Sequence, residues 1–483
     1  MNQVGLGKFM ERLRGEVPEA FKGTEPKAVP EFVVKGTSGS VEIVFTSLLE
    51  FLKSEGFAIY KRHGLCRNEM VFVHVAGHVI HRVSDVEIRR HMTSWVKSNR
   101  PHLFEAWLHK VGGLGGGIFE QLEAINPPIH SDTQDRIFLY FSNGILEITG
   151  EGWSLRPYSS IDGFIWEAMR LERNWVEDRS TGDWSKFLAN IMGGDAERLR
   201  RLKTGIGYLL SRHKDMALSK AVILTDESLD SESGGTGKGL LLKGISKLRK
   251  IQSLDFRTRR PDHFLFQGVS PDSNVVHIED ADKRLDFGIL FNAVTGDLEI
   301  ENKGETRLTV PFSESPKLAI STNFQFRGSS DSHARRKIEY ELASHYSAHH
   351  TPLDDFGHSL FSGWDSLEWH RFDTVMAGCA MAFLKEGLLG GLNLNVARKR
   401  LDVEVGKGFA EFMDAWTGKL SAGVSAAWQP TANFVDEYRT DSGDCRASTA
   451  DVSRKLRKWA DLRGWILTDK RGGGKREIGR AHV

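Results

Sequence analysis

Cysteine is scarce in this chain, which also lacks a long apolar run and a strong net charge. The three cysteines, Cys66, Cys379 and Cys445, lie far apart in 483 residues, so no spacing predicts a zinc site or a disulfide framework. No apolar run reaches the ~18 residues of a membrane-spanning helix, and no signal-peptide pattern is present. We therefore expect a soluble, cytoplasmic protein with no membrane partner.

The formal net charge of +1 excludes binding to nucleic acid through an overall positive charge. Only local basic patches remain for that role. Hydrophobic residues make up 40% of the chain, and a chain of this length is expected to form ~2 to 4 domains with buried cores.

A glycine-rich loop, GGTGKG, follows a strand-like apolar run at residues 221–227 and precedes an apolar helical stretch. Glycines let backbone N–H groups converge on phosphates, a lysine adds a positive charge, and a helix N-terminus favours an anion. The pattern predicts a nucleotide site. Its candidate residues are Gly234, Gly235, Thr236, Gly237, Lys238 and Gly239.

The loop departs from the usual phosphate-binding pattern at two positions. Glu232 stands where a glycine is usual, and Gly239 stands where a Mg²⁺-binding hydroxyl is usual. Either Thr236 or Ser233 would supply that hydroxyl, or the metal would rely on acidic residues and water. Taken alone, such a loop is also compatible with a plain turn. The motifs that follow it in the chain decide between a turn and a nucleotide site.

Two further apolar strands end in polar residues. The run at 274–282 ends in Glu279 and Asp280, and the run at 316–324 ends in Asn323. Ligands bind at the carboxyl ends of parallel strands, where one acid would hold Mg²⁺ and the other would polarise the attacking water, in either assignment. Asn323 would contact the γ-phosphate or that water. The alternative is a strand that ends in a solvated acidic turn.

Between these strands, residues 293–312 form two alternating segments around an Asn-Lys-Gly turn. This pattern predicts a hairpin with Lys303 at its tip. The lysine would contact the DNA backbone. The alternative is an exposed hairpin tip in which the lysine only favours solubility.

The order of these motifs resembles the superfamily 3 helicases of viruses, phages and plasmids, especially the phage and poxvirus primase-helicase branch. The matching segments are GGTGKG, HIEDAD, TGDLEIENKG, AISTN and HARRKIEYEL, all between residues 234 and 342. The resemblance covers about a quarter of the chain and implies a ring, usually a hexamer, with ATP and Mg²⁺ between neighbouring subunits and DNA in the centre. It further implies that Arg336, or Arg335, reaches into the neighbouring subunit's site.

The region before the loop is predicted to hold a small α+β module and then a helical part. A capping box at Ser84 and Glu87 predicts a helix start, and the glycine-rich stretch 111–119 is interpreted as a loop or linker. The histidines His63, His74, His78 and His81 are assigned to packing or surface roles, as are His345, His349 and His350. We find no Asp-x-Asp strand for primase chemistry, and we expect Asp132 and Asp135 to stay solvated.

Basic residues outnumber acidic ones after residue 446, where a helix, a strand, a basic turn and a closing strand outline a winged helix. We predict DNA contacts, with a protein-contacting wing or a solvated tail as the alternatives. The predicted contact residues are Lys470, Arg471, Lys475 and Arg476.

Together these patterns predict an α/β fold: an AAA+-like P-loop core with a central parallel sheet and a DNA hairpin. The expected domains are an α+β domain (1–110), a helical collar-like region (130–215), the ATPase core (216–373) and a helical and winged-helix-like domain (374–483). We predict an ATP-dependent, ring-forming DNA helicase of a phage or mobile element that translocates on single-stranded DNA and unwinds the duplex of a fork during replication. We expect it in the cytoplasm of a bacterial host, and its candidate partners are a primase or a loader. The alternatives are an origin-binding initiator and a regulatory or defence ATPase scaffold.

Overall fold

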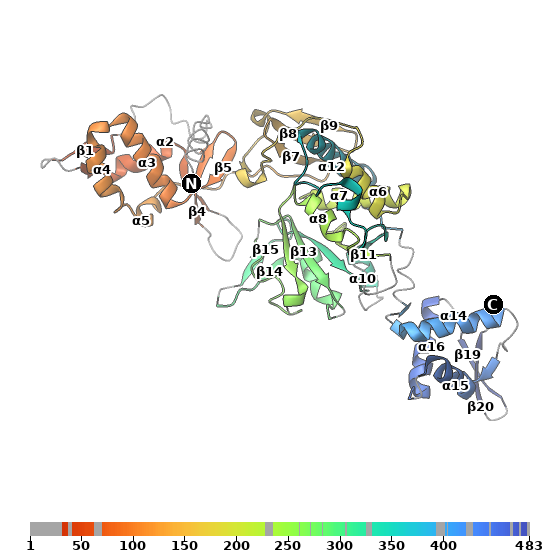
Figure 1. Cartoon of the computed structure of the whole chain (residues 1–483). Coiled ribbons are helices and arrows are strands. Elements are labelled where there is room, and N and C mark those ends of the chain that lie inside the picture. The colour runs from red at the N-terminus through yellow and green to blue at the C-terminus, as the bar shows by residue number, and fades with distance from the viewer. Residues whose placement is uncertain are drawn as a thin grey trace.

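The structure, a computed structural model, consists of an N-terminal domain, a central unit and a C-terminal unit (Figure 1). It describes residues 31–36, 41–61, 70–227, 235–259, 261–270, 272–282, 284–304, 307–324, 331–392, 401–402, 404–421, 428–443, 446–463, 467–472 and 475–480. Among these residues, no helix combines the length and the apolar character that crossing a membrane requires.

The N-terminal domain is a five-stranded mixed sheet covered by helices. Its strand order is β10-β5-β4-β3-β6, and a separate pair is formed by β1 (Val33–Lys35) and β2 (Val41–Ile43). The sheet strands are β3 (Phe57–Lys61), β4 (Met70–Ala76), β5 (Val79–Arg82), β6 (Ala124–Ile125) and β10 (Ile165–Trp166). The helices are α2 (Phe45–Ser54), α3 (Asp85–Asn99), α4 (Phe104–Val111) and the single turn α5 (Gly116–Phe119). The predicted capping box is confirmed, because Ser84 and Glu87 bond reciprocally at the start of α3.

The interpretation of residues 111–119 as a loop is correct for 112–115, which connect α4 to α5, but the alternative of a linker is wrong. Leu114, Phe119 and Leu122 are buried in the same cluster as Phe51 and Trp107. The glycines of this stretch alternate with apolar side chains, and burial of those side chains folds the segment onto the domain. The chain then returns to the sheet as β6.

In the central unit, one apolar cluster joins an antiparallel sheet, three helices and one face of the central parallel sheet. The antiparallel strands are β7 (Ile137–Phe141), β8 (Gly144–Ile148) and β9 (Trp153–Arg156). The helices are α6 (Asp183–Ile191), α7 (Ala196–Leu210) and α12 (Ser366–Glu386). A Cβ at Gly207 of α7 would lie 2.1 Å from the Cys379 carbonyl oxygen of α12, so only glycine permits this close helix contact.

The expectation that Asp132 stays solvated is wrong. Its carboxylate is buried, accepts backbone N–H bonds from Phe138 and Arg212, and pairs with the Arg249 guanidinium at 3.0 Å. Arg249 lies 117 residues further along the chain. Local sequence shows only a polar turn at 131–135, whereas the tertiary partner makes burial of this acid favourable. Asp135 remains exposed.

The central sheet is entirely parallel, with the strand order β12-β13-β16-β11-β17. Its strands are β11 (Ala221–Asp226), β12 (Ile251–Asp255), β13 (Val275–Ala281), β16 (Lys317–Thr322) and β17 (Lys337–Leu342). Val222 and Leu224 face one apolar cluster, and Ala221 and Ile223 face another. Burial on both faces is typical of a parallel sheet and explains why its strands appear in the sequence as continuous apolar runs.

Short elements complete the central unit around the sheet. They are α8 (Lys238–Ile245), α9 (Phe291–Thr295), the hairpin β14 (Leu298–Ile300) and β15 (Leu308–Val310), α10 (Asp331–Arg336) and α11 (Pro352–Phe356). The predicted hairpin is therefore present, and it projects from the central unit (Figure 1).

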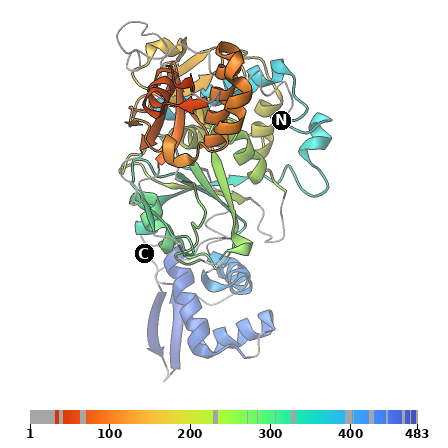
Figure 2. The same ribbon diagram turned by 90° about the vertical axis from the view of Figure 1, so that its left-hand side faces the viewer.

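The C-terminal unit has its own apolar cluster, built around Phe409, Trp416, Phe434 and Trp459. It lies at the opposite end of the molecule from the N-terminal domain in both views (Figure 2). Its elements are α14 (Lys407–Ser421), β18 (Trp428–Pro430), α15 (Thr431–Ser442), α16 (Thr449–Arg463), β19 (Leu467–Gly472) and β20 (Lys475–Arg480). The strands form an antiparallel sheet of order β18-β20-β19.

Candidate functional site

The glycine-rich loop connects the carboxyl end of β11 to the start of α8. Gly234, Ser233 and Glu232 lie outside the described residues. Gly235 (φ 83°) and Gly237 (φ 105°) have left-handed backbone angles, and a Cβ at Gly237 would lie 3.0 Å from the Phe187 ring. Side chains rarely adopt such angles, so the backbone geometry requires glycine at both positions. Gly237 is also the N-cap of α8, whose first residue is Lys238.

Lys238 is held between two strands of the sheet. Its Nζ donates to Oδ1 of Asp226 (2.5 Å), at the end of β11, and to Oδ1 of Asn323 (2.6 Å), just after β16. The side chains of Lys238 and Asp226 are 11% and 2% exposed, so this is a largely buried ion pair. The structure thus brings together Lys238 and Asn323, both of which were predicted.

Asp226 was not predicted as a site residue. The hydroxyl of Thr236 also donates to Oδ1 of Asp226, so one carboxylate oxygen accepts bonds from two residues of the loop. The signal in the sequence was an acid at the end of an apolar run, immediately before the glycine-rich loop.

The hydroxyl of Thr236 is directed into the protein, because the residue is buried and bonds to Asp226. Gly239 has open space where a side chain would stand. Thr236 and Gly239 therefore offer no metal ligand at the open edge of the sheet, where the acids of β13 do have carboxylate oxygens.

Glu279 and Asp280 lie at the carboxyl end of β13, as predicted. A bulge between Ile278 and Ala281 interrupts the pairing with β16, and Asp280 adopts φ 52°, which is uncommon for a residue other than glycine. Its carboxylate is 52% exposed and lies 3.6 Å from Arg257, while Glu279 is half-buried. Strained backbone of this kind is found where function fixes a side chain.

A buried histidine supports this bulge. His277 lies within hydrogen-bond distance of Ser321 Oγ (2.9 Å) and Ser253 Oγ (3.2 Å), and the backbone N–H of Asp280 donates to the same Ser321 Oγ (3.3 Å). Burial lowers the pKa of His277 to about 4, so the imidazole is neutral at pH 7.

The register of the sheet brings these groups to one edge. Strand β16 lies between β11 and β13, which places Asn323 between the Lys238–Asp226 pair and the acids Glu279 and Asp280. Carboxylate oxygens are the ligands that Mg²⁺ prefers, together with water and substrate phosphates. The site combines a phosphate-binding cation, an amide and two carboxylates, which is the set needed to bind a nucleoside triphosphate and its metal.

The two predicted arginines lie on α10, and their contacts differ. The Arg336 guanidinium is 4.6 Å from the Phe291 ring centroid, and its Nε donates to Thr295 Oγ1 (3.3 Å). Arg335 is exposed, and its Nε donates within its own helix, to the Asp331 carbonyl (3.3 Å). Arg336 is thus held against its own subunit, and Arg335 points to solvent.

The predicted DNA-contacting lysine of the hairpin, Lys303, is exposed next to Gly304, which has φ 75°. In the C-terminal unit the predicted contact residues lie on two paired strands, with Arg471 opposite Arg476 and Gly472 opposite Lys475. Lys470 precedes Arg471 on β19. The four basic residues therefore share one end of a hairpin.

A histidine loop lies against the glycine-rich loop. Ser347 is the residue nearest to Gly235, with its carbonyl carbon 3.4 Å from the position of a Cβ there. On this loop, His345 and His350 pair with the two carboxylate oxygens of Asp355, at 3.0 and 2.9 Å. These three side chains could also hold a metal ion, because their ligand atoms lie within 4.8 Å of one another. Sequence reasoning had assigned the histidines to packing or surface roles. Of the other five, His74 and His81 are buried, His78 is half-buried, His349 is exposed and His63 lies outside the described residues.

No protein-family model and no curated protein matches the sequence. Among solved structures, the chain is similar to the C-terminal region (residues 305–718) of NrS-1, with a TM-score of 0.43, 11% identity, and coverage of 90% of this chain and 98% of that one. It is also similar to JCV helicase (TM-score 0.25, 16% identity, coverage 49% and 65%). A full-length MCM homologue from Methanopyrus kandleri has a TM-score of 0.25 and 9% identity, with coverage of 80% and 90%. At these values the similarities do not assign a function, which rests on the site itself.

Proposed function

We propose that the chain is an ATP-dependent DNA helicase of the superfamily 3 type, with an AAA+-like P-loop core that works as a ring. The observation that carries the proposal is the position of Lys238. It lies at the N-terminus of α8 and bridges the ends of β11 and β16, and the neighbouring strand ends in Glu279 and Asp280. A cation, a helix N-terminus and acids that converge at one edge of a parallel sheet form a site for a nucleoside triphosphate with Mg²⁺.

The residues have separate roles in this proposal. Lys238 exchanges its bond to Asp226 for bonds to the β- and γ-phosphates, and the backbone N–H groups of the loop contact the same phosphates. One of Glu279 and Asp280 holds the metal, and the other orients the attacking water. When bound, Mg²⁺ neutralises phosphate charge and orients the oxygens. Asn323 contacts the γ-phosphate or the water and so responds to hydrolysis.

Arginines from a neighbouring subunit complete the site. An arginine supplied in this way stabilises the charge that develops on the transferred phosphoryl group and raises the rate by about 10³–10⁵ in related enzymes. We assign this role first to Arg335, because it is exposed, whereas Arg336 is held by Phe291 and Thr295. Because the two arginines are adjacent in the chain, an experiment that mixes variant and wild-type subunits is needed to decide which of them has this role.

Coupling to DNA rests on the hairpin and on the C-terminal unit. Lys303 at the tip of the hairpin would contact the phosphates of a single strand in the centre of the ring, and the basic end of β19 and β20 would contact DNA phosphates outside it. The basic C-terminal hairpin also supports a second candidate function, an origin-binding initiator whose ATPase assembles a ring on duplex DNA.

The test is unwinding of a forked duplex by the wild type, Lys238→Ala and the control Lys243→Ala, which removes an exposed lysine of the same helix. We expect ATP-dependent unwinding in the wild type and the control, and none in Lys238→Ala. Sequence-specific duplex binding without unwinding would instead support the initiator. ATP turnover that single-stranded DNA does not change would support a scaffold role, and unwinding by Lys238→Ala would refute the assigned site.

A further inference from the structure

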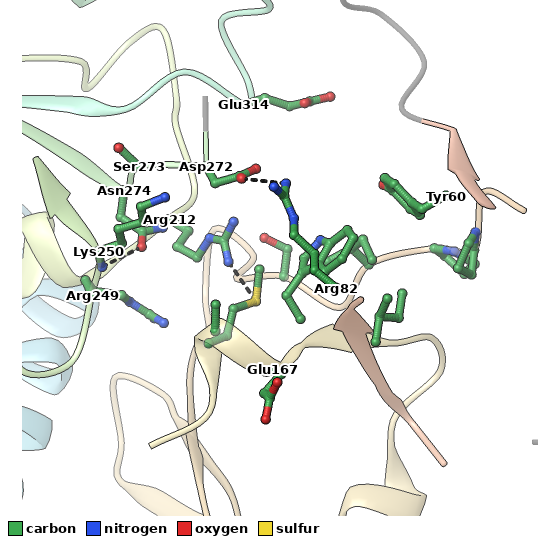
Figure 3. Close-up of a pocket in the computed structure, with 18 of the residues that line it drawn as sticks. Tyr60, Arg82, Glu167, Arg212, Arg249, Lys250, Asp272, Ser273, Asn274 and Glu314 are labelled. Carbon is green, nitrogen blue, oxygen red and sulfur yellow. Dashed lines mark hydrogen bonds and ion pairs between the residues drawn. The ribbon is translucent and has the colours of Figure 1, made fainter. Parts of the chain in front are cut away.

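A cavity lies at the edge of the central sheet opposite to the glycine-rich loop, between that sheet and the N-terminal domain (Figure 3). Its volume is about 760 Å³, within the range of about 300–1,000 Å³ that holds small ligands, and such sites are frequent at domain interfaces. Lys250, Asn274 and Ser315 line it immediately before β12, β13 and β16 begin. The cavity thus lies at the amino ends of the strands, whereas Lys238 and Glu279 lie at the carboxyl ends.

The wall on the sheet side carries three cations, Arg212, Arg249 and Lys250. Arg249 and Asp132 form a buried pair, in which Arg249 also donates to the carbonyl oxygens of Leu210 and Phe138. Arg212 lies close to this pair, but its guanidinium donates to the Met169 sulfur at 3.0 Å, and no acidic side chain accepts from it in the described part of the chain. Burial and the neighbouring Arg249 lower the pKa of Arg212.

The Asp132 and Asp272 carboxylates raise the pKa of Arg212 and so partly balance its charge, but the hydrogen-bond acceptor of its guanidinium is a thioether, which is a weak acceptor. Lys250 adds a second cation, whose Nζ donates to the hydroxyl of Ser270 at 2.9 Å. Two acids of the lining already pair with other residues, Asp272 with Arg82 at 3.0 Å and Glu167 with His81 at 3.0 Å. Glu314, at the rim, is exposed. An anion would therefore be stabilised beside Arg212 and Lys250.

The wall on the side of the N-terminal domain is apolar and aromatic. Tyr60 and Trp166 meet edge to face, with ring centroids 4.9 Å apart, and Ile80 and Pro128 line the same side. The Arg82 guanidinium lies 5.4 Å from the Trp166 ring centroid. In Figure 3, Tyr60 lies on the opposite side of the cavity from Arg249 and Lys250, and Arg82 extends between the two sides to Asp272. Aromatic side chains and arginine planes are the surfaces on which nucleobases stack.

We propose that this cavity binds a free nucleotide, with its phosphates beside Arg212 and Lys250 and its base against the wall formed by Tyr60, Trp166 and Arg82. Such a ligand would touch both the N-terminal domain and the ATPase sheet. It would reinforce the contact that the Arg82–Asp272 pair already makes between them. The proposal does not depend on the function assigned to the glycine-rich loop, because it involves different residues at the other edge of the sheet.

The test uses the full-length chain with Lys238→Ala, so that the glycine-rich loop no longer provides a high-affinity site. Binding of fluorescent ATP and GTP analogues is measured by anisotropy in this background. Arg212→Gln and Lys250→Gln are added separately, with Arg179→Gln as the control because that arginine is 75% exposed elsewhere in the central unit. We expect one nucleotide per chain, at least tenfold weaker binding in Arg212→Gln and in Lys250→Gln, and unchanged binding in the control. Thermal melting confirms that each variant is folded.

Three outcomes would overturn the proposal. In the first, the Lys238→Ala chain binds no nucleotide at millimolar concentration. In the second, Arg212→Gln and Lys250→Gln bind as tightly as their parent. In the third, an oligothymidine binds in an Arg212-dependent manner while free nucleotides do not, which would make the cavity a contact for a DNA strand. Inorganic triphosphate that binds as tightly as ATP would refute the role of the aromatic wall. Loss of ATP turnover in Lys238→Ala tests the proposed function separately.

Discussion

Substitution of Asp226 by asparagine tests how the nucleotide site is organised. Asp226 and Lys238 form a largely buried ion pair, with 2.5 Å between Oδ1 and Nζ. Removal of one partner of a buried pair costs about 3–5 kcal/mol, because the other charge stays buried. Asparagine keeps an oxygen for Lys238 and for Thr236, and Lys238 keeps its bond to Asn323. We therefore expect a smaller loss, of about 2 kcal/mol in the free energy of unfolding. Such a loss lowers the melting temperature of a domain of 150–250 residues by about 4–8 °C.

The same substitution should tighten nucleotide binding. In the wild type, phosphates must displace the Asp226 carboxylate from Lys238, and in Asp226→Asn they displace only a neutral amide. If the lost pairing of about 2 kcal/mol is recovered in the complex, the affinity for ADP rises by about 30-fold, since 1.4 kcal/mol is a factor of ten. The assays are calorimetric titration with ADP and melting with and without ADP, and Asp262→Asn, an exposed acid, is the control.

The outcomes for Asp226→Asn separate two roles. Weaker stability combined with tighter ADP binding means that the carboxylate competes with phosphate for Lys238. Weaker ADP binding in a folded variant would refute this reasoning, because Asp226 would then help to organise the loop for phosphate rather than oppose it.

Further predictions concern a histidine, a buried ion pair and the arginines of α10. Because the folded pKa of His277 is depressed to about 4 and the unfolded pKa is about 6.5, its neutral form contributes stability that is lost as pH falls from about 6.5 to 4. At pH 5 the loss is about 2 kcal/mol, so His277→Gln should flatten the melting temperature between pH 7 and pH 5, and an unchanged slope would contradict this. Arg249→Met leaves Asp132 buried and charged and should cost about 3–5 kcal/mol in urea unfolding, with partial recovery in the Asp132→Asn double variant; an additive loss would contradict coupling of the pair. When Arg335→Ala subunits are mixed with wild-type subunits, ATP turnover should fall by more than the fraction of variant subunits in the mixture. A stronger effect of Arg336→Ala in the same experiment would reverse the assignment.

The parallel sheet and the order of its motifs could be predicted because each strand is buried on both faces. Residues 221–226, 275–281 and 317–322 are strands in the structure, as predicted from continuous apolar runs. Lys238 and Asn323, separated by 85 residues, were expected at one edge because parallel strands end together, and their side chains are bonded.

Two features of the structure depend on partners that the local sequence does not contain. Asp132 lies in a polar turn, which suggests solvation, but Arg249 and two backbone N–H groups bury it. Asp226 follows the pattern of a strand that ends in a solvated acid. Its function as the partner of Lys238 and Thr236 arises only when the glycine-rich loop folds back over the end of β11.

The two edges of the central sheet are close enough for each to affect the other. Strand β13 runs from Val275, next to the cavity-lining residues Ser273 and Asn274, to Glu279 at the opposite edge. At ~3.3 Å per residue this is a separation of ~13 Å along one strand. Strand β12 spans the same distance in register with it, from Ile251, next to Lys250, to Asp255. Strands packed on both faces move as units rather than bend, because close-packed interiors are stiff. A ligand that shifts the amino ends of β12 and β13 would therefore also shift Glu279 and Asp280. A ligand bound in the cavity can thus change the geometry of the acids at the nucleotide site.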